Sequence, residues 1–229
     1  MSFLYEIVAA KRRHVDAAKQ AVALEELRER AIASRAGSCS HRLSAALARN
    51  GLNIIAEFKR KSPSKGVIRV DVDPLRMVSG YENGGAAAIS VLTEEDYFAG
   101  SLNDLYEVKS AVTLPVLRKD FLFDEFQIYE SAVAGADALL LIVAALDDEA
   151  LRSLRRLAEE ELGMDALVEV HDGNEMERAI ASGAKLIGVN NRNLHTFEVS
   201  LSTSLEHAGL ANSGCLLVSE SGLKSGDDL

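Results

Sequence analysis

The sequence predicts an α/β fold in which parallel strands close into a barrel that is surrounded by helices. From residue 53 onward, apolar segments of strand length alternate with helical segments, a pattern typical of a parallel sheet covered by helices. A glycine also recurs about every 50 residues, just before every second strand. The length of 229 residues suits one barrel domain, which typically takes about 250 residues.

The first 50 residues predict a helical extension that precedes the barrel. Residues 3–35 predict one long helix, because apolar residues share one face near its start and strong helix formers dominate its second half. The small polar residues of 34–40 predict a linker. Residues 41–51 predict a short helix that ends at Gly51.

Strands and helices then alternate along the rest of the sequence. Each predicted strand is a nearly continuous apolar run, as expected for a strand that is buried on both faces. The predicted strands are residues 53–59, 87–93, 114–120, 137–143, 165–171, 186–190 and 215–221. The predicted helices are residues 73–84, 101–112, 124–135, 147–162, 173–183 and 200–210.

Three glycines mark an internal repeat of two strand–helix modules. Gly85, Gly135 and Gly183 each follow a predicted helix and precede a strand, where a glycine ends the helix without a steric penalty. The regular spacing favours a closed barrel over an open doubly wound sheet, whose strand order reverses. The alternative is that Gly-Ala-Asp turns recur in any α/β protein.

The sequence supplies seven of the eight strands that a complete barrel requires. A further copy of the glycine repeat would begin just beyond Leu229. We expect residues 1–229 to form a single barrel domain, with 1–50 as the helical extension and 51–229 as strands one to seven with their helices. The last strand and helix are expected to be missing, which would expose the edges of strands one and seven.

The composition excludes several classes of function. The formal net charge of −10 argues against general nucleic-acid binding, because the phosphate backbone would be repelled. No segment is long and apolar enough to cross a bilayer, and the N-terminus lacks the order of a secretory signal. Cys39 and Cys215 form neither a disulfide framework nor a zinc motif, and the five histidines lack metal-ligand spacing. We expect a cytoplasmic protein without a metal.

Charged side chains at the predicted strand ends indicate the functional site, because barrel chemistry lies at the C-terminal ends of the strands. Glu57 and Lys59 share one face of strand one, Lys119 and Glu169 end strands three and five, and Asn190 ends strand six. One Lys–Glu pair there is explained by a salt bridge that fixes strand register. The four charges together favour an active site, with one acid and one base near neutral pH.

Two loops are candidates for binding an anion. "KRKSPSKG" (59–66) concentrates four cations around a proline turn whose backbone N–H groups can meet an anion, although a charged run is usually a solvated loop. "SESGLKSGDD" places Ser221 and Gly222 at a strand-to-helix junction, where the helix dipole favours phosphate. The alternative there is simple N-capping by Ser221 or Ser225.

Six motifs make the sequence resemble the indole-3-glycerol phosphate synthase family of tryptophan biosynthesis. They are "IIAEFKRKSPSKG", "ISVLTEEDYFAGS", "VLRKDFLFDEFQIYE", "ALVEVHD", "IGVNNRNL" and "VSESGL". The resemblance extends from residue 3 to the end, and an ordered set of this kind is far more specific than any one motif. It implies a TIM barrel with an N-terminal helical segment that packs over the mouth of the active site.

The resemblance also implies a reaction. The family converts 1-(2-carboxyphenylamino)-1-deoxyribulose 5-phosphate to indole-3-glycerol phosphate and releases CO2 and water, with no cofactor and no metal. The implied partner is therefore an anionic small molecule, rather than a nucleic acid or a membrane. We expect a monomer, with a weak homodimer as the alternative.

Residue roles follow from the same resemblance. Lys119 matches the general acid that protonates the ketone, and Glu169 matches the carboxylate that takes or returns a proton in the dehydration. Lys59 matches the lysine that holds the anionic groups, including phosphate, and that serves as a second acid. Glu57 would orient the lysines and the substrate hydroxyls, and Asn190 matches a residue of the catalytic set near the anthranilate carboxylate and the ribulose. The other implied binding residues are Ser62 and Arg192 for the carboxylate and ribulose, Phe98 and Phe121 for the aromatic ring, and Ser221 and Gly222 for the phosphate.

Two other functions stay open at the level of sequence. A sugar-phosphate isomerase on a related barrel would use carboxylate chemistry without the pair Lys59 and Lys119, so these lysines favour the lyase. An inactive, C-terminally shortened barrel is the non-enzymatic alternative. In the family, the loop after strand eight supplies the other half of the phosphate cradle, so we expect weak phosphate binding in its absence.

Overall fold

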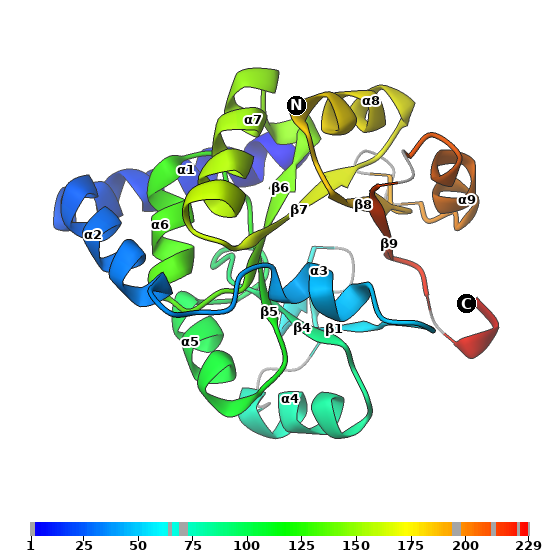
Figure 1. Cartoon of the computed structure of the whole chain (residues 1–229), viewed down its shortest axis with the longest axis horizontal. Coiled ribbons are helices and arrows are strands. Elements are labelled where there is room, and N and C mark those ends of the chain that lie inside the picture. Colours follow the sequence, from blue (N-terminus) through cyan, green and yellow to red (C-terminus); the bar gives the residue numbers. More distant parts are fainter. Residues whose placement is uncertain are drawn as a thin grey trace.

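Seven parallel strands form one curled sheet in the described part of the chain, and they lie in the order of the sequence (Figure 1). The computed structural model describes residues 3–63, 66–68, 73–193, 198–211, 214–223 and 225–228. The strands are β1 (Ile55–Phe58), β4 (Ala88–Leu92), β5 (Val116–Lys119), β6 (Ala138–Ile142), β7 (Asp165–Val170), β8 (Leu186–Asn190) and β9 (Leu216–Glu220). This confirms the predicted α/β fold, with seven strands of a TIM barrel close to their predicted bounds.

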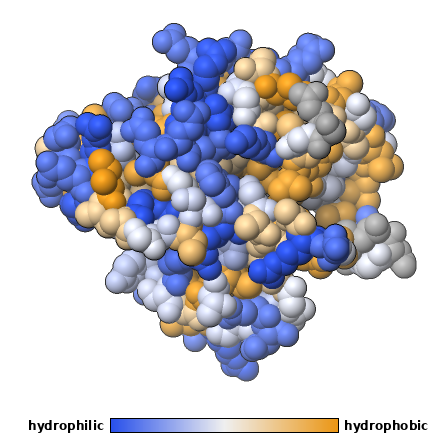
Figure 2. Space-filling view, in the orientation of Figure 1, coloured by the Kyte–Doolittle hydropathy of each residue, from blue (hydrophilic) through white to orange (hydrophobic). Residues whose placement is uncertain are grey.

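The strands β1 and β9 are the two edges of the described sheet. A small antiparallel hairpin of β2 (Lys61–Ser62) and β3 (Gly66–Val67) follows β1. Apolar side chains near the two edges remain exposed, among them Leu52, Ile54 and Leu217. Figure 2 shows apolar surface gathered on the side of the molecule where β9 lies, whereas the surface over α2 and α7 is mostly polar.

Helices follow the strands and surround the sheet (Figure 1). They are α4 (Pro74–Asn83), α5 (Leu102–Ala111), α6 (Glu125–Val133), α7 (Asp148–Arg156), α8 (Gly173–Ser182) and α9 (Ser202–Ala208). A π-helical turn (Leu157–Glu161) continues α7. Side-chain caps explain where many of these helices begin: the backbone N–H groups of their first turns donate to Asp73, Ser101, Asp124, Asp147 and Asp172. None of the described helices is long and apolar enough to span a membrane.

The three repeat glycines lie where the chain leaves a helix and turns into the next strand. Gly85, Gly135 and Gly183 have φ angles of +86°, +86° and +88°, in the left-handed region that side chains rarely adopt. Each glycine ends a helix, α4, α6 or α8, and leads into β4, β6 or β8. The glycine repeat therefore has the cause predicted from the sequence, which is that each glycine ends a helix in a left-handed conformation.

The long N-terminal helix predicted over residues 3–35 is in fact two helices, α1 (Phe3–Ala21) and α2 (Leu24–Arg35). The chain breaks at Ala23, which has an extended conformation. Two directions of packing explain the break: α1 crosses the cavity at the C-terminal ends of the strands, while α2 packs along α6 and buries Leu27 in the core. Tertiary packing therefore overrides a continuous helical propensity.

The third N-terminal helix, α3 (Arg42–Leu47), closes the opposite end of the barrel. It ends before the predicted Gly51, and its Leu43 is fully buried among the leucines that fill the barrel interior. The carboxylate of Asp165, at the start of β7, accepts hydrogen bonds from the backbone N of Leu43 at 2.8 Å and of Ser44 at 3.0 Å. An acidic residue at the start of a buried strand thus fixes α3 under the barrel.

Candidate active site

A cavity of about 830 Å³ opens at the C-terminal ends of the strands. Its walls come from α1, from the strand ends, and from both edges of the sheet. Every residue that the sequence singled out for catalysis or binding lines this cavity. These residues are Glu57, Lys59, Ser62, Phe98, Lys119, Phe121, Glu169, Asn190, Arg192, Ser221 and Gly222. A volume of this size is typical of a small-molecule site.

The ammonium group of Lys119 lies between two carboxylates on the cavity wall. Its Nζ is 3.2 Å from Oε2 of Glu169 and also donates a hydrogen bond to Oε2 of Glu220. Asn190 donates from Nδ2 to Oε1 of Glu169 at 3.1 Å. Four strand ends, those of β5 and, beyond β6, of β7, β8 and β9, therefore supply one cation, two anions and an amide to one point.

The charges of this cluster set one another's protonation. Burial opposes the charge on Lys119, but the carboxylates of Glu220 and Glu169 outweigh it and raise the pKa of this lysine. Burial likewise opposes the charge on Glu169, yet Lys119, His171 and Asn190 hold its pKa well below the usual value. Burial, together with repulsion from Glu169, raises the pKa of Glu220 to about 7, although Lys119 counteracts both. Of these three groups, Glu220 has the pKa closest to neutrality. The sequence analysis expected one acid and one base near neutral pH among Glu57, Lys59, Lys119 and Glu169, and it did not include Glu220.

A histidine that the sequence analysis did not select forms an ion pair with Glu169. His171 Nε2 lies 3.3 Å from Oε1 of Glu169, and its Nδ1 lies 3.1 Å from Oε2 of Glu175. Burial would lower the pKa of His171, but these two carboxylates raise it to about 10. The imidazole is therefore a cation at neutral pH and keeps Glu169 ionised.

Glu220 is the main residue of the site that the sequence analysis did not select, although it stands in the stretch "SESGLKSGDD". Its side chain passes over Gly188 of β8, where an added Cβ would meet Oε1 of Glu220 at 2.0 Å. That oxygen has no hydrogen-bond partner among the described residues. The glycine inside β8, a strand that otherwise reads as continuously apolar, is the sequence signal that makes room for this carboxylate.

The basic loop after β1 contributes fewer cations to the cavity than its sequence suggested. Lys59 lines the cavity and pairs with Glu57. Arg60 instead binds Asp104 on α5 through two hydrogen bonds of 2.5 and 2.6 Å. Lys61 donates to the backbone carbonyl of Asp96 at 3.2 Å. Residues 64 and 65 of the loop lie outside the described residues. One described cation of this loop, Lys59, therefore faces the cavity.

The aromatic and phosphate-side walls come from other loops. The rings of Phe98 and Phe121 face each other with centroids 6.2 Å apart. At the end of β9 the chain turns sharply, because Ser221 and Gly222 have φ angles of +65° and +88°. The sequence predicted the start of a helix after this strand. In the described part of the segment that follows, the structure instead has a single 3₁₀ turn, Gly226–Asp228.

The cavity combines an acid–base cluster of Lys119, Glu169 and Glu220 with the cation of Lys59. The rings of Phe98 and Phe121 add an aromatic wall. Among the described residues, no group of three or more histidine, cysteine, aspartate or glutamate side chains is placed to hold a metal ion. The chemistry that this geometry supports is proton transfer to and from an anionic substrate that carries a ring.

Comparison with known proteins identifies close relatives. A family model described as indole-3-glycerol phosphate synthase matches residues 4–229. A protein named indole-3-glycerol phosphate synthase from Chlorobium phaeovibrioides is 48% identical over 230 residues, which cover 100% of this chain and 88% of that protein. Indole-3-glycerol phosphate synthase 1 from Streptomyces coelicolor is 47% identical, with coverage of 100% and 84%. A solved N-acetylmannosamine-6-phosphate 2-epimerase from Clostridium perfringens shares the fold alone, with a TM-score of 0.58 and 15% identity over 82% of each chain.

Proposed function

The chain belongs to the indole-3-glycerol phosphate synthase family, and we propose that it converts 1-(2-carboxyphenylamino)-1-deoxyribulose 5-phosphate to indole-3-glycerol phosphate. The reaction closes a five-membered ring and releases CO2 and water. The observation that carries the proposal is the position of Lys119, held between Glu169 and Glu220 in a cavity with aromatic walls. An ammonium group held by two carboxylates in a cavity with aromatic walls is suited to meet the oxygen of a ketone.

Lys119 acts in the first step as the proton donor. The ring carbon that bears the carboxylate attacks the ketone carbon C2, and the ketone oxygen takes a proton from Nζ of Lys119. Loss of CO2 from that ring carbon then returns its electron pair to the ring and restores aromaticity. The two carboxylates keep Lys119 protonated before the reaction, so the donor is ready when the substrate binds.

Glu169 and Glu220 divide the dehydration between them. The new hydroxyl on C2 leaves as water, and the neighbouring carbon C1 loses a proton. Glu169 is held ionised by Lys119 and His171, so it is available to accept the proton from C1. Glu220 has a pKa of about 7 and carries a proton in part of the molecules at neutral pH. It is therefore the better donor to the departing hydroxyl.

The remaining residues bind and orient the substrate in this proposal. Lys59 and Arg192 supply positive charge to the anionic groups, and Glu57 orients Lys59 through its ion pair. The aromatic wall formed by Phe98 and Phe121 contacts the benzoate ring. The backbone after β9 at Ser221 and Gly222, together with Lys59, faces the phosphate, while Asn190 and Ser62 complete the polar wall. We further propose that the enzyme works as a cytoplasmic monomer without a cofactor.

The test is the appearance of indole fluorescence after the substrate is added to the protein. The chain contains no tryptophan, so an indole signal excited near the red edge of protein absorption comes from the product. We expect a linear increase that depends on protein concentration and a phosphorylated product with the mass of indole-3-glycerol phosphate. No product at any substrate concentration would contradict the proposal and support the inactive alternative.

A further inference from the structure

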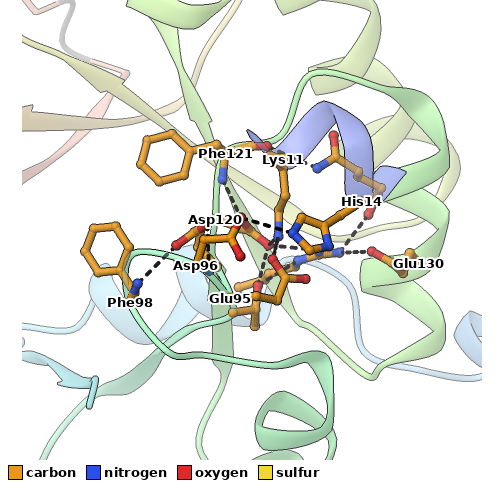
Figure 3. Close-up of polar contacts among 12 residues, drawn as sticks. Lys11, His14, Glu95, Asp96, Phe98, Asp120, Phe121 and Glu130 are labelled. Atoms are coloured by element: carbon orange, nitrogen blue, oxygen red, sulfur yellow. Dashed lines mark hydrogen bonds and ion pairs between the residues drawn. The ribbon is translucent and has the colours of Figure 1, made fainter. Parts of the chain in front are cut away.

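Helix α1 carries a lysine whose charge is buried between two loops at the mouth of the barrel. The side chain of Lys11 is only 2% exposed. Its Nζ lies 2.7 Å from Oε2 of Glu95 and 2.8 Å from Oδ2 of Asp120 (Figure 3). Glu95 belongs to the loop between β4 and α5, and Asp120 to the loop between β5 and α6. A buried ammonium group requires such partners, so Lys11 ties both loops to α1.

Each of these two loops presents one ring of the cavity wall. Phe98 lies three residues after Glu95, and Phe121 directly follows Asp120. Figure 3 shows the two rings projecting to the same side, away from Lys11. The second carboxylate oxygen of Asp120 accepts a hydrogen bond from the backbone N of Phe121 at 2.8 Å. One carboxylate therefore connects the ammonium group of Lys11 to the backbone that carries a ring.

The loop of Phe98 is equally constrained. The carboxylate of Glu94 accepts hydrogen bonds from the backbone N of Asp96 at 3.1 Å, Tyr97 at 2.7 Å and Phe98 at 3.0 Å. The segment that contains Glu95 therefore moves as one rigid turn. Pulling Glu95 toward or away from α1 shifts the ring of Phe98 with it.

We propose that Lys11 is a positioning residue that sets the separation of the Phe98 and Phe121 rings, and with it the binding of the aromatic part of the substrate. The inference rests on the function proposed above. Lys11 does not itself line the cavity, so it acts through Glu95 and Asp120 and not by touching the substrate.

The variant Lys11→Met tests the inference, because it keeps an apolar stem of similar length and removes the charge. Asp120 stays paired in this variant, with Nη2 of Arg118 at 3.0 Å and Oγ1 of Thr93 at 2.6 Å, so the protein is expected to fold. We expect KM for the substrate to rise about tenfold while kcat changes less than about threefold, since misplaced binding groups weaken the complex. Lys11→Arg, which restores a cation, is expected to return KM to within about threefold of the parent value.

Lys19→Met is the matched control. Lys19 lies on the same helix and pairs with Asp124 at 2.5 Å, but this pair is partly exposed and touches neither Glu95 nor Asp120. We expect the parent KM in this variant. A lower melting temperature with unchanged KM in Lys11→Met, a loss confined to kcat, or an equal effect of Lys19→Met would each overturn the positioning role.

Hydrogen exchange separates this inference from the function on which it rests. In Lys11→Met, amide exchange in residues 94–100 is expected to be faster than in Lys19→Met, because Lys19 contacts the other loop, at Asp124. If the parent protein makes no product, the proposed function fails, and the exchange experiment alone decides the coupling of Lys11 to the loop that carries Phe98. Equal exchange in the two variants would then refute that coupling.

Discussion

At the scale of single residues, the site contains more carboxylates than ammonium groups around Lys119. Two carboxylates, Glu169 and Glu220, share the single ammonium group of Lys119. Since His171 and Asn190 also stabilise Glu169, the excess proton affinity falls on Glu220. The local geometry thus separates one permanent anion from one carboxyl group that titrates in the physiological range.

Replacing Lys119 by alanine tests the proton donor. We expect Lys119→Ala to lower kcat by at least about 100-fold, which is the usual contribution of a general acid, while substrate binding in equilibrium dialysis is largely kept. Lys185→Ala is the control, because Lys185 is exposed and lies away from the cavity. Turnover of the Lys119 variant at the parent rate would show that another group supplies the proton.

The pKa of Glu220 predicts a pH dependence with a definite sign. Below about pH 7 Glu220 is protonated, and above it the group becomes an anion that can no longer donate and that repels an anionic substrate. We therefore expect kcat/KM of the parent to fall as pH rises through about 7. In Glu220→Gln, which is neutral at every pH, this decrease of kcat/KM with pH is expected to disappear. If the decrease persisted unchanged in the variant, a group other than Glu220 would cause it.

Sequence patterns located most of these residues for one physical reason. The carboxyl ends of parallel strands meet at one end of a barrel, so charged residues that end separate apolar runs, such as Lys119 and Glu169, necessarily come close together. The sequence pattern could not single out Glu220. Its position in the cavity depends on the space above Gly188, and its pKa depends on sharing Lys119 with Glu169. Lys11 was also missed, since its partners lie in loops that a sequence does not place.

At the scale of elements, strands were easier to predict than helix boundaries. A strand such as β6 or β8 is a short apolar run between turn residues, and its bounds follow from burial on both faces. The break between α1 and α2 follows no proline or glycine signal, because it arises where one helix covers the cavity and the next packs on α6. Helix ends set by tertiary packing are therefore the part of this fold that local sequence does not specify.

The contact between α3 and β7 predicts a measurable loss of stability. In Asp165→Asn, an amide replaces a buried anion that accepts hydrogen bonds from the backbone N atoms of Leu43 and Ser44 and from the Ser44 hydroxyl at 2.5 Å. We expect the free energy of unfolding to fall by about 1–3 kcal/mol, as for a weakened buried hydrogen-bond group. Urea titration followed by circular dichroism measures it.

The control for this contact is an exposed ion pair. Glu160 pairs with Arg156 one helical turn away, and its side chain is half exposed. Glu160→Gln is expected to change the free energy of unfolding by less than about 0.5 kcal/mol. If the two variants lost the same small amount of stability, the anchoring of α3 by Asp165 would be contradicted.

At the scale of the whole molecule, the N-terminal extension contacts both ends of the barrel. Helix α1 lines the cavity with Leu4 and Ile7 and pairs Lys11 with Asp120, while α3 inserts Leu43 into the interior from the opposite end. Between them, α2 places Leu27 in the same core cluster as residues of the sheet. The extension therefore shares its buried surface with the barrel and has no separate core of its own among the described residues.

This shared core predicts that the extension and the barrel unfold together. A tryptophan introduced by Leu24→Trp, at the partly exposed start of α2, would report on the extension alone, since the chain has no other tryptophan. We expect its fluorescence transition in urea to coincide with the far-ultraviolet circular dichroism transition of the whole chain, as in a two-state domain. Adding Asp165→Asn should lower both midpoints equally. A fluorescence transition at clearly lower urea than the circular dichroism transition would mean that residues 1–50 fold as a unit apart from the barrel.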